Sequence, residues 1–254
     1  MKIATWNVNS LRVRLPHVLE WLQAQQPDVL ALQEIKMTDD QFPVEQFNEC
    51  GYQAVWSGQK TYNGVAIVSK HPTQDVVTDF PGWQDDQRRI LAATIDGVRI
   101  VNFYVPNGES VASDKYQYKL AWLKAAKQWL AAEFKQHDKM IVVGDFNIAP
   151  EDRDVHDPAA WQGQVLCSDA ERAALTEIMA LGFVDSLRLF EQEAGVFSWW
   201  DYRAAAFRRN MGMRIDLLLV SAALQDRCRA SYVDKQPRKL ERPSDHAPVI
   251  LELT

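Results

Sequence analysis

Cysteine is scarce in this sequence and its three copies are scattered. Cys50, Cys167 and Cys228 are spread over 254 residues, and no CxxC pair occurs. An odd number of separated cysteines argues against a disulfide framework and against a structural zinc site. Apolar runs long enough to cross a bilayer are also absent, and the chain enters a strand-like pattern at its first residues. We therefore expect a soluble protein of the reducing cytoplasm with no membrane attachment.

The sequence also lacks linkers, repeats and an excess of positive charge. No stretch rich in serine and glycine, internal repeat or low-complexity tract divides it. A sandwich of 254 residues is commonly one domain, and 47% hydrophobic residues are ample for a large core, so we expect residues 1–254 to form a single domain. We also expect the protein to act as a monomer. The net charge of −6 does not indicate nucleic acid. A cluster of cation-binding carboxylates would contribute to that balance, so the charge excludes no such partner either.

Short apolar runs typical of β-strands recur along the whole chain. They lie at about 2–6, 29–33, 53–57, 65–69, 90–95, 98–104, 140–146, 214–221 and 249–253. Several are continuously apolar, as expected for strands that are buried on both faces. Asp96-Gly97, between two of these runs, is the clearest hairpin signal in the sequence.

Apolar residues at helical spacing predict three helices between the strands, over 15–25, 116–134 and 169–181. We place Pro16 in the first turn of the first helix. Ser168 and Glu171 form a capping box before the third helix, and Gly182 ends it. This order predicts a four-layer α/β sandwich, in which two mixed, mostly antiparallel sheets pack face to face and are flanked by helices.

Polar residues stand at the ends of several of these apolar strands. Those that follow a strand are Asn7, Glu34, Asp145 and Asn147, and those that precede one are Asp216, Asp245 and His246. Antiparallel neighbours bring the end of one strand beside the start of the next, so all of them can lie on one edge. Each residue alone is compatible with a turn, a cap or a buried polar contact. The set as a whole indicates a site.

The side chains at these positions indicate a particular chemistry. Carboxylates and asparagine amides with a single nearby histidine are donors that select Mg²⁺ or Mn²⁺ over zinc. Magnesium sites of this kind serve hydrolysis of phosphate esters, in which a carboxylate orients or deprotonates the attacking water. A protonated His246 could donate to a phosphate oxygen, with Asp216 hydrogen-bonded to its other ring nitrogen.

Eight short motifs occur in an order that covers nearly the whole chain. They are Thr5-Trp6-Asn7-Val8-Asn9, Leu32-Gln33-Glu34, Gly64-Val65-Ala66, Tyr104-Val105-Pro106-Asn107-Gly108-Glu109, Gly144-Asp145-Phe146-Asn147-Ile148-Ala149-Pro150, Phe197-Ser198-Trp199-Trp200-Asp201-Tyr202-Arg203, Arg214-Ile215-Asp216 and Ser244-Asp245-His246-Ala247-Pro248. Leu32-Gln33-Glu34 alone would be weak, but the ordered set is specific. The chain resembles the exonuclease III group of DNA-repair nucleases, within the superfamily that includes deoxyribonuclease I.

The resemblance implies roles for individual residues. Glu34, with Asn7 and Asn9, resembles the principal metal site, and Asp245 a further ligand of the metal or phosphate. Asp145 resembles the residue that orients or deprotonates water, its role depending on whether one metal or two act. His246 paired with Asp216 resembles the phosphate-polarising histidine. The implied phosphate contacts are Tyr104, Asn107 and Asn147, and Tyr62 resembles a DNA-facing residue.

The resemblance also implies an apolar pocket that accepts a flipped-out abasic sugar, at Trp199, Met213 and Ile215. Met213 is smaller than the tryptophan of the animal enzymes, and Trp199 fits pocket or core equally. The segment 154–167 matches no motif, and its position suggests that it lies against the DNA. We hypothesise that Trp161 and Leu166 in it favour trimming of frayed 3′ ends over entry of an internal abasic site.

We therefore predict a magnesium-dependent DNA-repair nuclease, with manganese as a possible substitute. Its substrate is double-stranded DNA with 3′ ends or abasic sites, and its activities are 3′→5′ exonuclease, 3′-end cleaning and abasic-site cleavage. Two alternatives remain. One is a phosphoesterase of small phosphate compounds on the same fold, and the other is a non-catalytic DNA-binding relative.

Overall fold

The computed structural model describes residues 1–254 and contains two six-stranded sheets. The first runs in the order β13 (Cys228–Val233), β14 (Val249–Leu253), β1 (Lys2–Asn7), β2 (Val29–Gln33), β4 (Val65–Ser69) and β3 (Gln53–Ser57). The second runs β5 (Gln74–Val77), β6 (Ile90–Ile95), β7 (Val98–Tyr104), β8 (Met140–Asp145), β12 (Asp216–Ser221) and β9 (Phe183–Asp185). In each sheet one pair is parallel, β1 with β2 and β7 with β8, and the other pairs are antiparallel.

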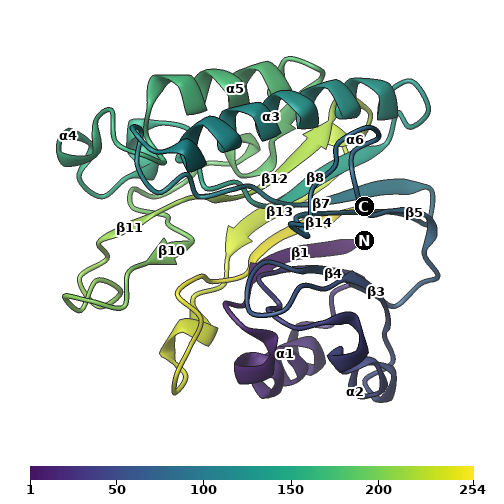
Figure 1. Ribbon diagram of the computed structural model, residues 1–254. Coiled ribbons are helices and arrows are strands. Elements are labelled where there is room, and N and C mark those ends of the chain that lie inside the picture. Colours follow the sequence, from purple (N-terminus) through teal and green to yellow (C-terminus); the bar gives the residue numbers. More distant parts are fainter.

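Helices cover the outer faces of both sheets (Figure 1). The helices on the first sheet are α1 (Leu11–Gln25) and α2 (Val44–Glu49), and those on the second are α3 (Asp114–Glu133) and α5 (Asp169–Met179). Short elements complete the chain: α4 (Pro158–Trp161), α6 (Ala222–Gln225), the ribbon of β10 (Trp199–Trp200) and β11 (Gly212–Met213), and 3₁₀ turns at Asp39–Gln41, Asp152–Asp154, Ser186–Leu189 and Gln236–Lys239. The predicted four-layer sandwich is confirmed.

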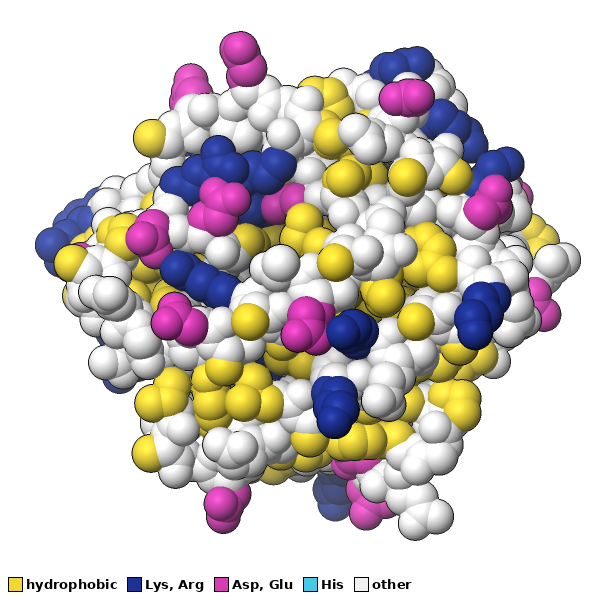
Figure 2. All heavy atoms as spheres, turned by 90° about the horizontal axis from the view of Figure 1, so that it is seen from above, with side chains coloured by type: hydrophobic (Ala, Val, Ile, Leu, Met, Phe, Trp, Pro, Cys, Tyr) yellow, Lys and Arg dark blue, Asp and Glu magenta, His cyan; other side chains and the backbone are white.

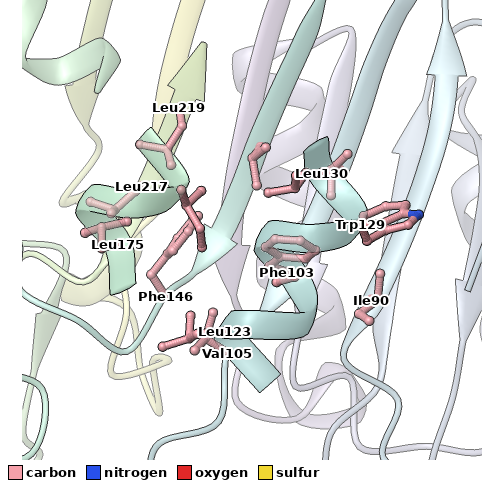
Figure 3. Packing of buried hydrophobic residues seen from close by; sticks show 14 of the residues in the cluster. Ile90, Phe103, Val105, Leu123, Trp129, Leu130, Phe146, Leu175, Leu217 and Leu219 are labelled. Atoms are coloured by element: carbon pink, nitrogen blue, oxygen red, sulfur yellow. The ribbon is translucent and has the colours of Figure 1, made fainter. Parts of the chain in front are cut away.

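Three apolar cores hold these layers together. One lies between the sheets and includes Ile3, Ile67, Ile100 and Val143, all fully buried. A second lies between the second sheet and helices α3 and α5, where Phe103 and Trp129 pack together (Figure 3). The third lies under α1 and α2. Full burial of one such side chain contributes about 1.5–3 kcal/mol, so these cores fix the sheets and with them the strand ends.

The outer face of the α3 and α5 layer carries basic and acidic side chains interspersed with apolar ones (Figure 2). No large field of one sign covers this face, which agrees with the modest net charge of −6. No helix is long and apolar enough to cross a membrane.

Local sequence signals explain several boundaries. Asp96 and Gly97 both have positive φ, at 50° and 74°, and join β6 to β7 in the predicted hairpin. The predicted capping box of α5 is present, with Ser168 accepting from the backbone of Glu171. The prediction for Pro16 is wrong, because α1 begins at Leu11 and contains the proline in its interior. Its ring removes one backbone hydrogen bond there.

Five strands have no counterpart in the sequence prediction: β5, β9, β10, β11 and β13. Three of them lie at sheet edges, where one long side is unpaired, and the other two form the separate ribbon. Strand β13 illustrates the difficulty, since Arg229 is exposed within it and its burial does not alternate cleanly. Edge strands need fewer apolar residues than central ones, so their sequence signal is weak.

Candidate active site

The strand ends that carry the predicted polar residues meet at one edge of the sandwich. In the second sheet Asp216 stands opposite Asp145 in the antiparallel register of β12 and β8, and Tyr104 stands opposite Asp145 in the parallel register of β7 and β8. In the first sheet Asn7 ends β1, and Glu34 follows β2 directly. Asn7 on the first sheet donates to Asp145 on the second at 2.9 Å, so the predicted convergence on one edge is confirmed. Both chain termini lie at the opposite edge, away from β10 and β11 (Figure 1).

Close backbone approaches and positive φ angles shape this edge. Gly144 has φ +139°, and a Cβ at that position would lie 1.9 Å from the carbonyl oxygen of Phe103. Only glycine allows β8 to pass so near β7 immediately before Asp145. Glu34 and Asn147 also adopt positive φ, at 52° and 48°, which turns the chain sharply after each strand.

Buried amides fasten the two sheets together beneath the site. The side chain of Gln33 donates to Thr5 and to Asn102, each at 2.8 Å. Asn102 in turn donates to the carbonyl oxygens of Leu32 and Ala66, at 2.9 and 3.0 Å. These bonds cross from β7 to β2 and β4, so the strand ends of the two sheets are held in fixed relation.

His246 and Asp216 form the central ionic pair. Nδ1 of His246 lies 2.9 Å from Oδ2 of Asp216, and Nε2 lies 3.7 Å from Oδ2 of Asp145. Burial alone would lower the pKa of His246, but Asp216 and Asp145 outweigh that effect and raise it to about 10. The imidazole is therefore protonated at neutral pH and can donate a proton or a hydrogen bond from Nε2.

Asp216 is itself oriented by Ser198. The serine hydroxyl donates to Oδ2 of Asp216 at 2.6 Å and accepts from the backbone N–H groups of Ile215 and Asp216. All these atoms are buried. The carboxylate is thus fixed in position behind the imidazolium.

Asp145 occupies the centre of the site. Its side chain accepts from Asn7 Nδ2 and from the backbone N–H of Asn147, each at 2.9 Å. Burial raises the pKa of Asp145 to about 7, with Asp216 and Glu34 adding to the rise and His246 and Asn7 opposing it. A carboxylate with a pKa near neutrality is suited to accept a proton from water.

Glu34 lies beside Asp145 and is partly exposed. It accepts from Asn7 Nδ2 at 2.8 Å, and Nζ of Lys36 lies 3.0 Å from its other oxygen. Lys36 also donates to Oδ1 of Asn9 at 2.7 Å. The amide oxygen of Asn7 accepts the backbone N–H of Asn9 at 3.0 Å.

The donor set fits a hard divalent cation. Ligand atoms of Glu34, Asp145 and His246 all lie within 4.8 Å of one another. Since His246 is protonated and bound to Asp216, the oxygens of Glu34 and Asp145 are the donors that remain for a cation. A divalent cation beside them would offset the burial and the carboxylate repulsion that raise the pKa of Asp145. Two oxygen donors with room for water suit magnesium or manganese rather than zinc.

Asp245 has a different environment from the other carboxylates. Its oxygens accept from Asn9 Nδ2 and from the indole N–H of Trp199, each at 3.0 Å. Burial would raise the pKa of Asp245, but His246, Trp199 and Asn9 together lower it. Asp245 therefore stays ionised and connects the Asn9 loop to the Trp199 strand.

Three further predicted residues border the site. Burial and the nearby Glu34 raise the pKa of Tyr104 well above its ordinary value, so its hydroxyl remains a donor. The guanidinium of Arg89 lies 4.6 Å from the centre of the Tyr104 ring. Asn107 donates to the side-chain oxygen of Asn147 at 3.2 Å, and Asn147 donates to the carbonyl of Val105 at 2.9 Å.

These groups line a cavity of about 340 Å³ with one polar and one apolar wall. Its lining residues are Glu34, Tyr104, Asn107, Asp145, Asn147, Trp161, Val165, Leu166, Trp199, Asp201, Arg203, Ile215, Asp245 and His246. Met213 is fully buried and lies outside this lining, paired with Trp199 across the β10–β11 ribbon. Tyr62 is exposed and lines a neighbouring hollow of about 730 Å³, which shares Tyr104 and Asn107 with the cavity.

The structure adds residues that the sequence prediction missed. Lys36 and Arg89 have no positional signal beyond their charge, and their partners are distant in sequence. Ser198 lies within a recognised motif, yet nothing in the motif identifies it as the residue that holds Asp216. Such contacts depend on tertiary packing, which spacing alone does not encode.

Comparisons with known proteins identify the family of this chain. Residues 4–246 match the endonuclease/exonuclease/phosphatase family. The chain is 36% identical to exodeoxyribonuclease III of Haemophilus influenzae, over 99% of both chains. It superimposes on a 3′–5′ exonuclease from Neisseria meningitidis with a TM-score of 0.98 and 48% identity, covering 100% and 99% of the two chains. An AP endonuclease from Archaeoglobus fulgidus gives 0.95 and 40%, with the same coverage. The chain therefore belongs to the exonuclease III/AP endonuclease group of DNA-repair nucleases, within the endonuclease/exonuclease/phosphatase family.

Proposed function

We propose that this protein is a magnesium-dependent nuclease that hydrolyses phosphodiesters in duplex DNA. It removes nucleotides from 3′ ends, clears blocked 3′ termini and incises DNA 5′ to abasic sites. The observation that carries this proposal is that His246, held by Asp216, faces Asp145 and Glu34 in one cavity. A related 3′ phosphatase from Neisseria, 47% identical, is described as bound to a product DNA hairpin, which supports DNA as the substrate.

In this proposal each side chain has a defined task. Glu34 and Asp145 hold Mg²⁺, which supplies positive charge to the phosphate and the leaving oxygen when bound. Asp145, kept ionised beside the cation, orients the attacking water and accepts its proton. His246 donates to a phosphate oxygen and spreads the charge that develops there. Asn7, Asn9 and Asp245 keep the metal-side loops in place.

The remaining polar residues bind the phosphate. Tyr104 and Asn147 donate to its oxygens, and Asn107 supports Asn147 through their direct hydrogen bond. These donors are uncharged, so they add no repulsion to the phosphodiester. Tyr62, in the adjoining hollow, provides a stacking or backbone contact for the DNA strand that leaves the cavity.

The apolar wall governs the choice between 3′ ends and internal abasic sites. Trp199 and Ile215 form one part of it and Trp161 and Leu166 another, while Met213 packs behind. We propose that the bulk of Trp161 and Leu166 restricts entry of an abasic sugar that is still continuous with DNA on both sides. A frayed 3′ end needs less space and is therefore preferred.

Replacement of Trp161 and Leu166 by glycine tests this preference. The rate of abasic-site cleavage relative to exonuclease rate should rise, measured on matched duplexes in Mg²⁺. Leu240→Gly is the control, because Leu240 is exposed and does not line the cavity. An unchanged ratio in the double variant would refute the proposed role of this wall.

One assay separates the proposed function from its two rivals. A duplex with a recessed 3′ end should be degraded in Mg²⁺ and spared in EDTA. A small-molecule phosphoesterase would instead hydrolyse p-nitrophenyl phosphate and leave the duplex intact. A DNA-binding relative without activity would retain the duplex without cleaving it.

A further inference from the structure

A fully buried ion pair outside the site contacts three of the segments that build it. Lys119, on α3, and Glu171, at the start of α5, both have 0% exposed side chains and are directly paired. Burial lowers the pKa of Lys119, and the carboxylate of Glu171 opposes that shift. Burying both charges costs free energy, so a buried pair is weak evidence for stability alone.

The lysine holds two backbone segments of the site. Its Nζ donates to the carbonyl oxygen of Asn147 at 2.6 Å and to that of Asn107 at 3.0 Å. The three donors of the ammonium group are thereby matched to Glu171 and these two carbonyls. The same two residues are joined through their side chains, Asn107 Nδ2 to Asn147 Oδ1, at 3.2 Å. The lysine therefore fixes the backbone on which both amides are mounted.

Local strain explains why this backbone needs an anchor. Asn147 has φ 48°, in the left-handed region that ordinary side chains disfavour. Gly108, which follows Asn107, has φ +95°, and a Cβ there would lie 3.2 Å from the Lys119 side chain and 3.3 Å from that of Val165. The lysine stem is thus packed directly against this turn.

Glu171 fixes the backbone of the apolar wall of the cavity, as Lys119 fixes that of the two asparagines. Its carboxylate accepts the backbone N–H of Leu166 at 3.0 Å and that of Ser168 at 3.1 Å. Leu166 has φ 75°, a conformation that is costly for a branched side chain. The carbonyl oxygen of Leu166 accepts from Ala149, so the strained residue is held on both sides. Glu171 thus fixes the direction in which Leu166 projects into the cavity.

We propose that the Lys119–Glu171 pair positions the active site, with Lys119 aligning Asn107 and Asn147 and Glu171 aligning the Leu166 wall. Neither residue touches the substrate. The inference rests on the proposed function, because it concerns phosphate contacts and substrate choice at that same site. It adds a single buried element that sets both the hydrolysis rate and the preference among DNA ends.

Two variants separate the halves of the pair. Lys119→Met combined with Glu171→Gln removes both buried charges, so no unpaired charge remains in the core. The introduced glutamine retains an oxygen for the Leu166 and Ser168 N–H groups. The introduced methionine leaves the carbonyl oxygens of Asn107 and Asn147 without the donor that Lys119 provides. We expect the exonuclease turnover rate to fall about 10- to 100-fold, as for other groups that orient a site from behind, with KM nearly unchanged.

Glu171→Ala combined with Lys119→Met tests the wall by comparison with Lys119→Met combined with Glu171→Gln, because neither protein then contains an unpaired buried lysine. Glu171→Ala removes the acceptor for the N–H of Leu166, so the leucine can leave its strained conformation. We expect the ratio of abasic cleavage to exonuclease rate to differ between these two proteins, and to be the same in both when each also carries Leu166→Gly. If the protein with Glu171→Ala does not fold, Glu171→Asp combined with Lys119→Met, which shortens the acceptor by one methylene, provides the same comparison.

Arg99→Met is the matched control. Arg99 forms another buried pair, with Glu133 at 2.8 Å, at the end of β7 remote from Tyr104. Its loss should lower the melting temperature without altering the turnover rate or the activity ratio of the folded protein. If the Lys119–Glu171 variants behave like this control, the pair is merely structural and the proposal is wrong.

A readout that does not depend on DNA cleavage distinguishes this proposal from the proposed function. The readout is the NMR signals of the side-chain NH₂ groups of Asn147 and Asn107, in protein labelled at asparagine. These signals should shift and broaden in the variant that combines Lys119→Met with Glu171→Gln, and they should stay unchanged in Arg99→Met. Unchanged signals in both would overturn the positioning role. If wild-type protein failed to degrade DNA while these signals responded, only the proposed function would fail.

Discussion

Replacement of Asp145 by asparagine should abolish activity and at the same time stabilise the metal-free protein. Asp145 is buried beside Glu34 and Asp216, and its pKa is raised from 3.8 to about 7. Each pKa unit corresponds to about 1.4 kcal/mol, so the ionised carboxylate destabilises the fold by up to roughly 4 kcal/mol at pH 8. Asparagine has the same shape without the charge and removes this cost.

Hydrogen bonding reduces the gain. The oxygens of Asp145 accept from two N–H donors, of Asn7 and Asn147, and asparagine can offer an oxygen to only one of them. A donor left without a partner costs about 1–3 kcal/mol, which leaves a net stabilisation of about 1–3 kcal/mol at pH 8. The change of this stabilisation with pH does not include the cost of the unpaired donor, because the same N–H donors are present at every pH.

The sign of that dependence follows from the raised pKa. Stability associated with the protonated carboxyl is fully present below the unfolded pKa of 3.8 and is lost as pH rises through about 7. The advantage of Asp145→Asn over wild type should therefore increase by about 2–3 kcal/mol between pH 5 and pH 8. Chemical unfolding in EDTA at pH 5 and pH 8 measures this advantage. Mg²⁺ should make wild type the more stable of the two proteins, because wild type binds the cation more tightly. An advantage that does not change with pH would refute the assigned electrostatics.

Three other predictions follow from the same geometry. Asp216→Asn should lower the pKa of His246 from about 10 toward its ordinary value. NMR titration of the imidazole in metal-free protein measures this pKa, and an unchanged value would contradict the ion pair. Because His246 must stay protonated, the wild-type rate should decline only as pH approaches 10, whereas the rate of the Asp216→Asn variant should decline at lower pH. Coincident pH–rate profiles would show that Asp216 does not keep His246 protonated. Gly144→Ala should destabilise the protein by several kcal/mol in thermal unfolding, because the alanine Cβ would lie 1.9 Å from the carbonyl oxygen of Phe103. Wild-type stability in this variant would mean that β8 can move away from β7.

The central strands and the polar residues at their ends could be predicted from the sequence. Buried strands such as β2 and β8 are continuously apolar, so their bounds follow from composition, and Asn7, Glu34 and Asp145 mark where they stop. The hairpin at Asp96-Gly97 and the cap at Ser168 follow from residues whose local conformational preferences are strong. These features depend on short-range chemistry.

The missing parts depend on packing. In the sequence Lys119 is only one polar position in a helix, because the carbonyls of Asn107 and Asn147 that it contacts are brought to it by the fold. The interior position of Pro16 is tolerated because α1 is held by its buried face against the sheet. Exposed edge strands such as β13 carry little apolar pattern. Tertiary context decides each of these cases.

The most direct test of the central claim is the single-turnover rate of 3′-end hydrolysis on a recessed duplex in Mg²⁺. Wild type should cleave in Mg²⁺ and lose activity in EDTA. Asp145→Asn and His246→Ala should each lower the rate by several orders of magnitude while both proteins remain folded. Near wild-type rates in both variants would contradict the assignment of this site.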